Sequence, residues 1–300
     1  MILQHLERAL RHPDKTYNFA ARKVKEVLFW DYYYNAIRNP KVRSAIPNST
    51  ELHNEIVKEL KKSNFEVLDF EIDISDYSRY VNQAEYHKFP TYYKGGKAKN
   101  FAEKTLEHYL AIKLLDLSKN DIYIDVASNN SPVAEIYQRL YGCKVYKQDL
   151  ILPRGINGNN IGGDAGNMPV KDGFATKMAL HDALQCFEKD SDIEFIKEVS
   201  RVLKKGGKLC ILPLYFFTSY AVQTDPDAMP KGGISFESDV MLYCIKGFGC
   251  RFNRIYDVPQ FVNRIINNLN GLKFTLYVVQ NEKEVAPSCY IKLMGLFEKE

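Results

Sequence analysis

The pattern of apolar and polar positions divides the chain into a helical front segment and a longer region in which strands and helices alternate. Leucines recur at helical spacing from Leu3 onward, and prolines interrupt the pattern into separate helices. A Ser-Thr-Glu cap at 49–51 predicts a further helix that ends near Asn64. The following segment, 65–74, fits either a short strand or an extended linker.

From residue 101 onward the periodicity is typical of a parallel sheet with crossover helices. Strands are predicted at 122–128, 144–150, 174–180 and 208–216. Helices are predicted at 101–117, 132–142 and 193–207, the last of them ended by two glycines. The segment 217–252 reads as irregular, and the end of the chain predicts a helix at 258–271 and a hairpin-like strand pair at 274–281 and 288–299.

Composition and charge narrow the class of protein. The net charge of +4, from 41 basic and 37 acidic residues, gives no argument for a nucleic-acid partner. The 6 cysteines show neither a CxxC pair nor Cys/His spacing, so we expect reduced thiols in a cytoplasmic protein and no metal site. The N-terminus lacks the pattern of a signal peptide, and no apolar run approaches the length of a membrane span.

Polar or small residues follow the predicted strands in a fixed order. Asp125 lies near the end of the strand predicted at 122–128, and a loop of small residues follows it. The next strand ends in Asp149. A Gly-Asp-Ala segment at 163–165, a strand ending at His181 and a helix with the ending LKKGGKL follow. In this order and spacing, these motifs over about residues 101–300 resemble the class I, S-adenosylmethionine-dependent methyltransferases.

The resemblance implies a fold, a domain organisation and a cofactor. The fold would be α/β, with a Rossmann-like seven-stranded sheet whose last strand is antiparallel, behind an N-terminal helical segment. Residues 1–100 would form a helical or lid segment, and residues 101–300 would form the methyltransferase domain, with 217–254 inserted as a substrate cap. The cofactor would be S-adenosyl-L-methionine and the product S-adenosyl-L-homocysteine.

The resemblance also assigns cofactor contacts. It places them at Asp125, Ala127, Ser128, Asn130, Asp149, Leu150, Asp164, Ala165, Leu180 and His181. The carboxylate of Asp149 would accept hydrogen bonds from the ribose hydroxyls, as an acid does in dinucleotide-binding folds. The loop departs from the family, which commonly has Gly-x-Gly where this chain has Ala, Ser and Asn. Asparagine tolerates left-handed backbone angles, so the turn is feasible.

His181 and Asp182 are the candidate catalytic residues. A neutral imidazole can take a proton from an acceptor hydroxyl, because its ordinary pKa lies near physiological pH. The alternative is that His181 packs against the cofactor without proton transfer, since methyl transfer often needs positioning more than a base. Asp182 would cap a helix or orient His181.

Aromatic and basic residues near the sheet edge are the candidate acceptor-binding groups. They are Tyr92, Tyr93, Tyr215, Tyr220 and Arg251. Aromatic faces stabilise a positive sulfonium, and tyrosine hydroxyls and arginines hold a sugar or an anionic group. The segments 254–265 and 271–279 resemble methyltransferases encoded with glycan or polysaccharide assembly genes. That resemblance implies O-methylation of a sugar, a glycan or another small molecule.

Three other functions stay open at this point. A nicotinamide-dependent oxidoreductase would suit the βαβ start, but the GxGxxG motif is absent. A non-catalytic adenosyl-binding or scaffold protein would explain the missing glycines of the first loop. An RNA or protein methyltransferase ranks lower, because neither an Asn-Pro-Pro-Tyr motif nor a basic stripe is present. The N-terminal helices would be either a lid or an arm of a homodimer.

Overall fold

The computed structural model of the chain describes residues 42–43, 49–225, 228, 234, 236–245 and 247–300. The chain divides into two compact units, one of Met1–Pro47 with Ala221–Asn253 and one of Asn48–Tyr220 with Arg254–Glu300. The predicted N-terminal helices, and the dimerisation arm or lid that they would form, lie outside the described residues.

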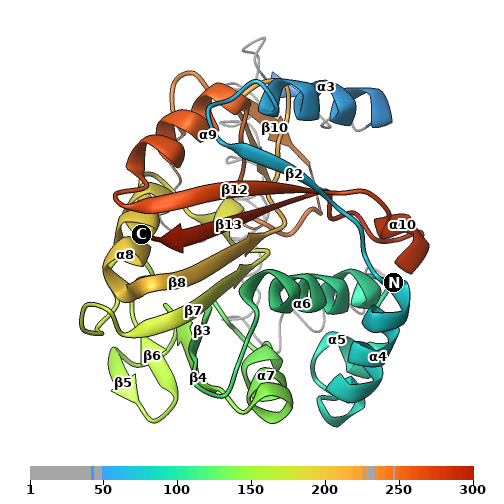
Figure 1. The fold of residues 1–300 in the computed structure, drawn as a ribbon. Helices are drawn as coiled ribbons and strands as arrows, with labels where there is room; N and C mark the ends of the chain where they lie inside the picture. Colours follow the sequence, from blue (N-terminus) through green and yellow to red (C-terminus); the bar gives the residue numbers. More distant parts are fainter. Residues whose placement is uncertain (1–41, 44–48, 226–227, 229–233, 235, 246) are drawn as a thin grey trace, which may run out of the picture. The chain divides into compact units, whose positions relative to one another are not determined.

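The larger unit is built on a nine-stranded sheet with the order β2-β12-β13-β8-β7-β3-β4-β6-β5 (Figure 1). The strands are β2 (Glu66–Phe70), β3 (Ile122–Val126), β4 (Lys144–Asp149), β5 (Gly155–Asn157), β6 (Asn160–Gly162), β7 (Ala175–His181), β8 (Leu203–Leu212), β12 (Leu272–Val279) and β13 (Leu293–Lys299). The central strands β4, β3, β7 and β8 run parallel, whereas β13 is antiparallel to both β8 and β12. The carboxyl ends of the parallel strands therefore meet at one edge.

Helices cover both faces of this sheet. They are α3 (Thr50–Leu60), α4 (Ile74–Ala84), α5 (Tyr93–Gly96), α6 (Phe101–Leu115), α7 (Val133–Tyr141), α8 (Ser191–Val202), α9 (Val258–Arg264) and α10 (Glu282–Val285), with 3-10 turns η1 (Tyr86–Lys88), η2 (Leu184–Cys186) and η4 (Ile266–Asn268). One hydrophobic cluster joins the sheet to α3, α8 and α9, and a second joins its other face to α4, α6 and α7 (Figure 1).

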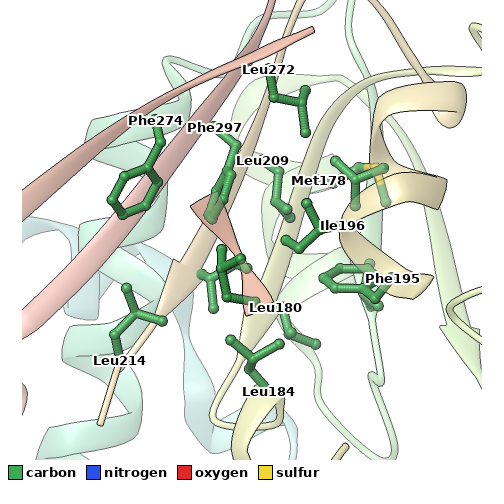
Figure 2. Packing of buried hydrophobic residues seen from close by; sticks show 14 of the residues in the cluster. Met178, Leu180, Leu184, Phe195, Ile196, Leu209, Leu214, Leu272, Phe274 and Phe297 are labelled. Atoms are coloured by element: carbon green, nitrogen blue, oxygen red, sulfur yellow. The ribbon is translucent and has the colours of Figure 1, made fainter. Parts of the chain in front are cut away.

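Alternation along each strand assigns residues to the two faces. On β7, Met178 and Leu180 belong to the first cluster, whereas Ala179 between them belongs to the second. Figure 2 shows Met178 and Leu180 packed beside Phe195 and Ile196 of α8. A strand that is covered on both faces is a nearly continuous apolar run, which is why these strands are visible in the sequence.

The Rossmann-like α/β class and the antiparallel last strand are confirmed, with differences in detail. The sheet has nine strands, because the segment 65–74 supplies β2, which pairs parallel with β12, and a β5–β6 hairpin extends the opposite edge. The glycines expected to end the helix at 193–207 lie instead within β8. There the register jumps from Leu203 opposite Ala175 to Lys208 opposite Lys177, and Gly206 adopts a φ of 74°.

The smaller unit contains short parallel strands within the segment that was predicted to be irregular. β1 (Val42–Arg43) pairs with β10 (Met241–Cys244), and β10 pairs with β9 (Ala221–Thr224). The chain returns to the larger unit through β11 (Asn253–Ile255). Among the described residues of both units, no helix is long and apolar enough to cross a membrane.

A buried ionic cluster fastens α8 to the C-terminal part of the larger unit. The Asp192 carboxylate accepts hydrogen bonds from Arg264 Nη2 at 2.7 Å and from the Tyr256 hydroxyl at 2.7 Å. It also lies 2.9 Å from Nη1 of Arg254, and both side chains of that ion pair are 0% exposed. Removing one partner from such a cluster leaves uncompensated charge away from water, so the substitution lowers the free energy of unfolding.

We expect Asp192→Asn to lower the free energy of unfolding by about 3–5 kcal/mol, because two arginines lose their shared anion. Urea unfolding followed by circular dichroism measures this loss. The control is Asp190→Asn, whose side chain is 72% exposed and which pairs with Arg264 at 3.2 Å. That variant should lose no more than about 1 kcal/mol. Equal losses in the two variants would contradict the structural role of the cluster.

Candidate functional site

A cavity of about 350 Å³ lies at the carboxyl ends of β3 and β7. Its walls are the loop 125–131 after β3, the residues 181–183 after β7, the segment 91–93, and three side chains of α6, Lys104, Glu107 and His108. Ligands of open α/β sheets bind at this edge, because the loops that follow parallel strands converge there. The cavity is therefore the candidate functional site.

The loop after β3 turns without glycine. Ala127 and Asn129 adopt left-handed angles, with φ of 51° and 44°. Hydrogen bonds to β4 hold this backbone, because the Ala127 N–H donates to Gln148 Oε1 at 3.2 Å and the Asn129 N–H donates to Asp149 Oδ2 at 2.7 Å. These bonds offset the cost of about 1–2 kcal/mol that a left-handed residue with a Cβ carries. The absence of Gly-x-Gly thus leaves the turn itself intact.

Two buried polar atoms at the base of this loop have no hydrogen-bond partner among the described residues. Asp125 is 1% exposed, and its Oδ2 has no hydrogen-bond partner in the described part of the chain. Burial raises the pKa of this carboxyl well above its ordinary value. The Ser128 Oγ is buried and likewise unpaired among the described residues. Unsatisfied buried polar atoms that line a cavity indicate a ligand with complementary hydrogen-bonding groups.

His181 presents an imidazole that is neutral at physiological pH. Both ring nitrogens are buried and have no hydrogen-bond partner within the residues the structure describes. Burial, with a contribution from the nearby Lys104 charge, lowers the pKa of His181 to about 3. The ring packs edge-on against His108, with a centroid distance of 5.0 Å. His181 is therefore a hydrogen-bonding group of the cavity and a weak base.

Asp182 is held by three donors. Its backbone takes a left-handed φ of 48°. Its carboxylate accepts from the Tyr215 hydroxyl at 2.9 Å, from Gln185 Nε2 at 2.7 Å and from Lys104 Nζ. The donors fix the orientation of this carboxylate, which makes Asp182 a rigid part of the cavity wall.

Lys104 joins Asp182 to Glu107 on α6. Lys104 is 4% exposed, Glu107 is 0% exposed, and Lys104 Nζ donates to Glu107 Oε1 at 2.7 Å. Burial raises the pKa of Glu107 well above its ordinary value, and Lys104 partly opposes this shift. Burial would lower the pKa of Lys104, but the two carboxylates outweigh it and raise that pKa. Glu107 Oε2 has no partner in the described residues.

A chain of tyrosines anchors the segment 91–93. The Tyr92 hydroxyl lies 3.2 Å from His108 Nε2, and the Tyr86 hydroxyl lies 2.7 Å from His108 Nδ1. The Tyr80 hydroxyl extends this network to α4 at 2.8 Å from that of Tyr86. Burial lowers the pKa of His108 well below its ordinary value, so its ring is neutral. The network fixes the position of Tyr92 in the cavity wall.

The cavity brings together many of the residues named from the sequence. They are Asp125, Ala127, Ser128, Asn130, His181, Asp182, Tyr92 and Tyr93. Asp149 lies beside it at the end of β4 and holds the loop, and the next side chain, Leu150, is 71% exposed. Tyr215 adjoins the cavity through Asp182.

Other predicted residues lie outside the cavity lining. Asp164 and Ala165 follow β6, where the Asp164 carboxylate accepts from the Gly166 N–H at 2.8 Å. The side chain of Leu180 is 0% exposed and belongs to the core cluster. The Tyr220 hydroxyl accepts from Arg254 Nε at 2.9 Å, within the larger unit. Arg251 belongs to the smaller unit.

The sequence analysis missed the polar face of α6. Glu103, Lys104, Glu107 and His108 repeat at a spacing of four residues, a pattern that normally indicates a solvated helix face. Here the helix is buried, with most of its residues inaccessible to solvent. The apolar residues on the remaining faces of the helix were the available signal, because a helix with apolar residues on several faces packs against neighbours on those faces. No group of three or more His, Cys, Asp or Glu side chains in the described residues is arranged to hold a metal ion.

We expect His181→Gln to reduce the loss of stability on acidification. The folded-state pKa of about 3 lies below the ordinary value of 6.5, so the unfolded state binds the proton preferentially. The stability from a neutral His181 is complete above pH 6.5 and is lost as the pH falls toward 3. Between pH 7 and pH 5 the variant should lose about 2 kcal/mol less than the parent protein.

Urea unfolding at the two pH values measures this difference. The matched control is His87→Gln, because the His87 side chain is exposed on the 3-10 turn before the cavity segment. It should keep the parent pH dependence. A His181 ring signal that titrates near pH 6.5 in the folded protein would contradict the buried, neutral imidazole.

Comparison with known proteins gives one family match. The family described as "Methyltransferase domain" matches residues 124–211, which run from β3 through β8. This stretch contains the β3 loop, Asp149 and the His181–Asp182 pair. No curated protein matches the chain.

Comparison with solved structures gives matches at low sequence identity and with TM-scores below 0.5. The 1,6-didemethyltoxoflavin-N1-methyltransferase of Burkholderia thailandensis, with bound 1,6-didemethyltoxoflavin and S-adenosylhomocysteine, is 10% identical, with a TM-score of 0.44 over 86% of this chain and 93% of that one. A protein of Pyrococcus horikoshii OT3 is 17% identical, with a TM-score of 0.45 over 72% and 99%. The geranyl diphosphate C-methyltransferase of Streptomyces coelicolor A3(2) is 12% identical, with a TM-score of 0.41 over 68% and 82%.

Proposed function

We propose that this chain, a class I methyltransferase that takes S-adenosylmethionine as cofactor, methylates a hydroxyl oxygen of a small molecule bound in the cavity beside α6. When bound, the cofactor supplies an electrophilic methyl group on a positively charged sulfur. The protein must hold this group and the acceptor in line and exclude water from both.

The residues present fit the cofactor. The β3 loop offers the unpaired Asp125 Oδ2 and Ser128 Oγ as buried hydrogen-bonding atoms. Asp149 uses each carboxylate oxygen once, for the Asn129 N–H and the Ile151 N–H, which leaves acceptor capacity for ribose hydroxyls. Leu150 and Ile151, which are 71% and 77% exposed, offer apolar surface to an adenine ring.

One observation carries the choice of a hydroxyl acceptor. Glu107 Oε2 and both His181 nitrogens are buried, line the same cavity and lack partners among the described residues. An ionised carboxylate only accepts hydrogen bonds, and a neutral imidazole accepts at one nitrogen and donates at the other. A ligand that satisfies them must bring both donors and an acceptor, and a hydroxyl group can act as either. Tyr92 and Tyr93 supply the aromatic wall of the same space.

The finer features named from the sequence stay predictions. A sugar or glycan satisfies the donor requirement, but so does any small polyol or phenol. The roles of residues 1–100 as a lid and of 217–254 as a substrate cap, the homodimer and the cytoplasmic location are part of this proposal and need their own tests.

The cofactor site is tested by calorimetric titration with S-adenosylmethionine. We expect micromolar binding to the parent protein and at least tenfold weaker binding to Asp149→Ala, since one charged hydrogen-bond partner is worth about 1.5–3 kcal/mol. The control is Asp172→Ala, because that side chain is 83% exposed and pairs with Arg201 away from the loop.

Two outcomes would count against the proposal. Equal affinities for the parent protein and Asp149→Ala would remove Asp149 from the cofactor site. Binding of S-adenosylmethionine without methyl transfer to any member of a broad hydroxyl-acceptor panel would favour the alternative of a non-catalytic adenosyl-binding protein on the same fold.

A further inference from the structure

One carboxylate oxygen in the cavity is set apart from the others by its surroundings. Glu107 Oε1 is engaged by Lys104, whereas Oε2 is buried, lines the cavity and has no partner in the described residues. The neighbouring Asp182 carboxylate already accepts hydrogen bonds from Lys104, Tyr215 and Gln185. Glu107 thus carries the available acidic oxygen that α6 contributes to the cavity lining.

We propose that Glu107 is the catalytic base of the reaction: its Oε2 receives the hydrogen bond and then the proton of the acceptor hydroxyl, while Lys104 and Asp182 act as positioning residues. This inference rests on the proposed function, because it requires the acceptor to lie in the same cavity. His181, a weak base, orients the acceptor through a hydrogen bond.

The chemistry balances in charge and atoms. The acceptor oxygen forms a bond to the methyl carbon as the carbon–sulfur bond breaks, and the electron pair of that bond stays on sulfur. The hydroxyl proton passes to Glu107 Oε2. A positive sulfonium and a negative carboxylate become a neutral thioether and a neutral carboxylic acid, so the buried site creates no new charge. The proton passes from Glu107 to water when the next molecule of S-adenosylmethionine binds.

The cluster around Glu107 is suited to this exchange. Lys104 carries one positive charge and faces two carboxylates, so the ionised triad has a net charge of −1. A negative triad attracts a sulfonium and has no such attraction for a thioether, because charges interact strongly in a medium of low dielectric constant. The same burial raises the pKa of Glu107, which brings a carboxyl group toward the range of an effective base at neutral pH.

Other titratable groups face Glu107 from several elements and compete with it as the source of a released proton. They are Glu103, Lys104 and His108 on α6, Tyr92 and Tyr93 before it, Asp125 at the end of β3, His181 and Asp182 at the end of β7, and Tyr215 and Tyr290. Burial raises the pKa of the tyrosines and lowers that of both histidines, so these groups stay neutral. Glu103 resembles Glu107 most closely, since burial raises its pKa to about 7.

The proposal predicts a difference in proton release between the two cofactor forms. Without ligand, burial favours the protonated form of Glu107. Binding of S-adenosylmethionine places a positive charge in the cavity and should expel the proton, whereas S-adenosylhomocysteine should not. Calorimetric titration of each compound in two buffers of different ionisation enthalpy counts the protons released, with no need for an identified acceptor.

We expect the parent protein to release more protons with S-adenosylmethionine than with S-adenosylhomocysteine near neutral pH, with a difference of up to about one. Glu107→Gln should bind both compounds and lose the difference. Glu103→Gln is the matched control, one helical turn earlier on α6, where Glu103 Oε2 accepts from the Tyr290 N–H at 2.7 Å; it should keep the difference. The parent protein should also prefer S-adenosylmethionine increasingly as the pH rises, a readout that needs no variant.

The outcomes distinguish a failure of the role of Glu107 from a failure of the proposed function. Binding of both compounds with equal proton counts, or a difference that persists in Glu107→Gln, would overturn the role of Glu107 and leave the cofactor assignment standing. A parent protein that binds neither compound would overturn the proposed function, and this inference with it.

Discussion

The buried ammonium of Lys104 is the interaction on which the candidate site depends. A cation that is 4% exposed must be paired, and Lys104 meets carboxylates from two elements, Glu107 on α6 and Asp182 after β7. This pairing fixes the helix over the strand ends and holds Asp182 at its left-handed φ of 48°. Removing the cation would leave the buried Glu107 carboxylate and the 28% exposed Asp182 carboxylate without their shared counter-charge. Lys104 therefore both stabilises this wall and sets its charge.

A second wall of the cavity, the loop after β3, rests on hydrogen bonds from loop amides to side chains of the adjacent strand. The loop after β3, residues 125–131, contains no glycine. In this chain, Gln148 and Asp149 of the adjacent strand bind the loop amides, and the left-handed Ala127 and Asn129 are held in place. Asp149 consequently holds the loop, and the proposed function adds a second task, to accept hydrogen bonds from a ribose. A mutation there tests both, which is why binding should be compared with the folded state of the variant.

Burial divides the polar residues of the site by chemistry. The same desolvation keeps the imidazoles of His108 and His181 neutral and raises the pKa of Glu107, because it disfavours the charged form of every group. Histidine, the usual candidate for a base, thereby becomes a hydrogen-bonding residue, and a glutamate becomes the better base. This reversal follows from the environment and is invisible in the residue types alone.

The sequence by itself determined the alternation of strands and helices from residue 101 onward and the antiparallel end of the sheet, and it placed Asp125, Ser128 and Asp149 at the ends of adjacent parallel strands. These follow from local periodicity and from the rule that polar residues at the ends of parallel strands converge. Only the tertiary structure decided the rest: that 66–70 pairs as an edge strand, that the glycines near 206 lie inside β8, and that the charged face of α6 is buried. Those features depend on which distant segments pack together, and a charged helical stripe has the same pattern whether it faces water or a cavity.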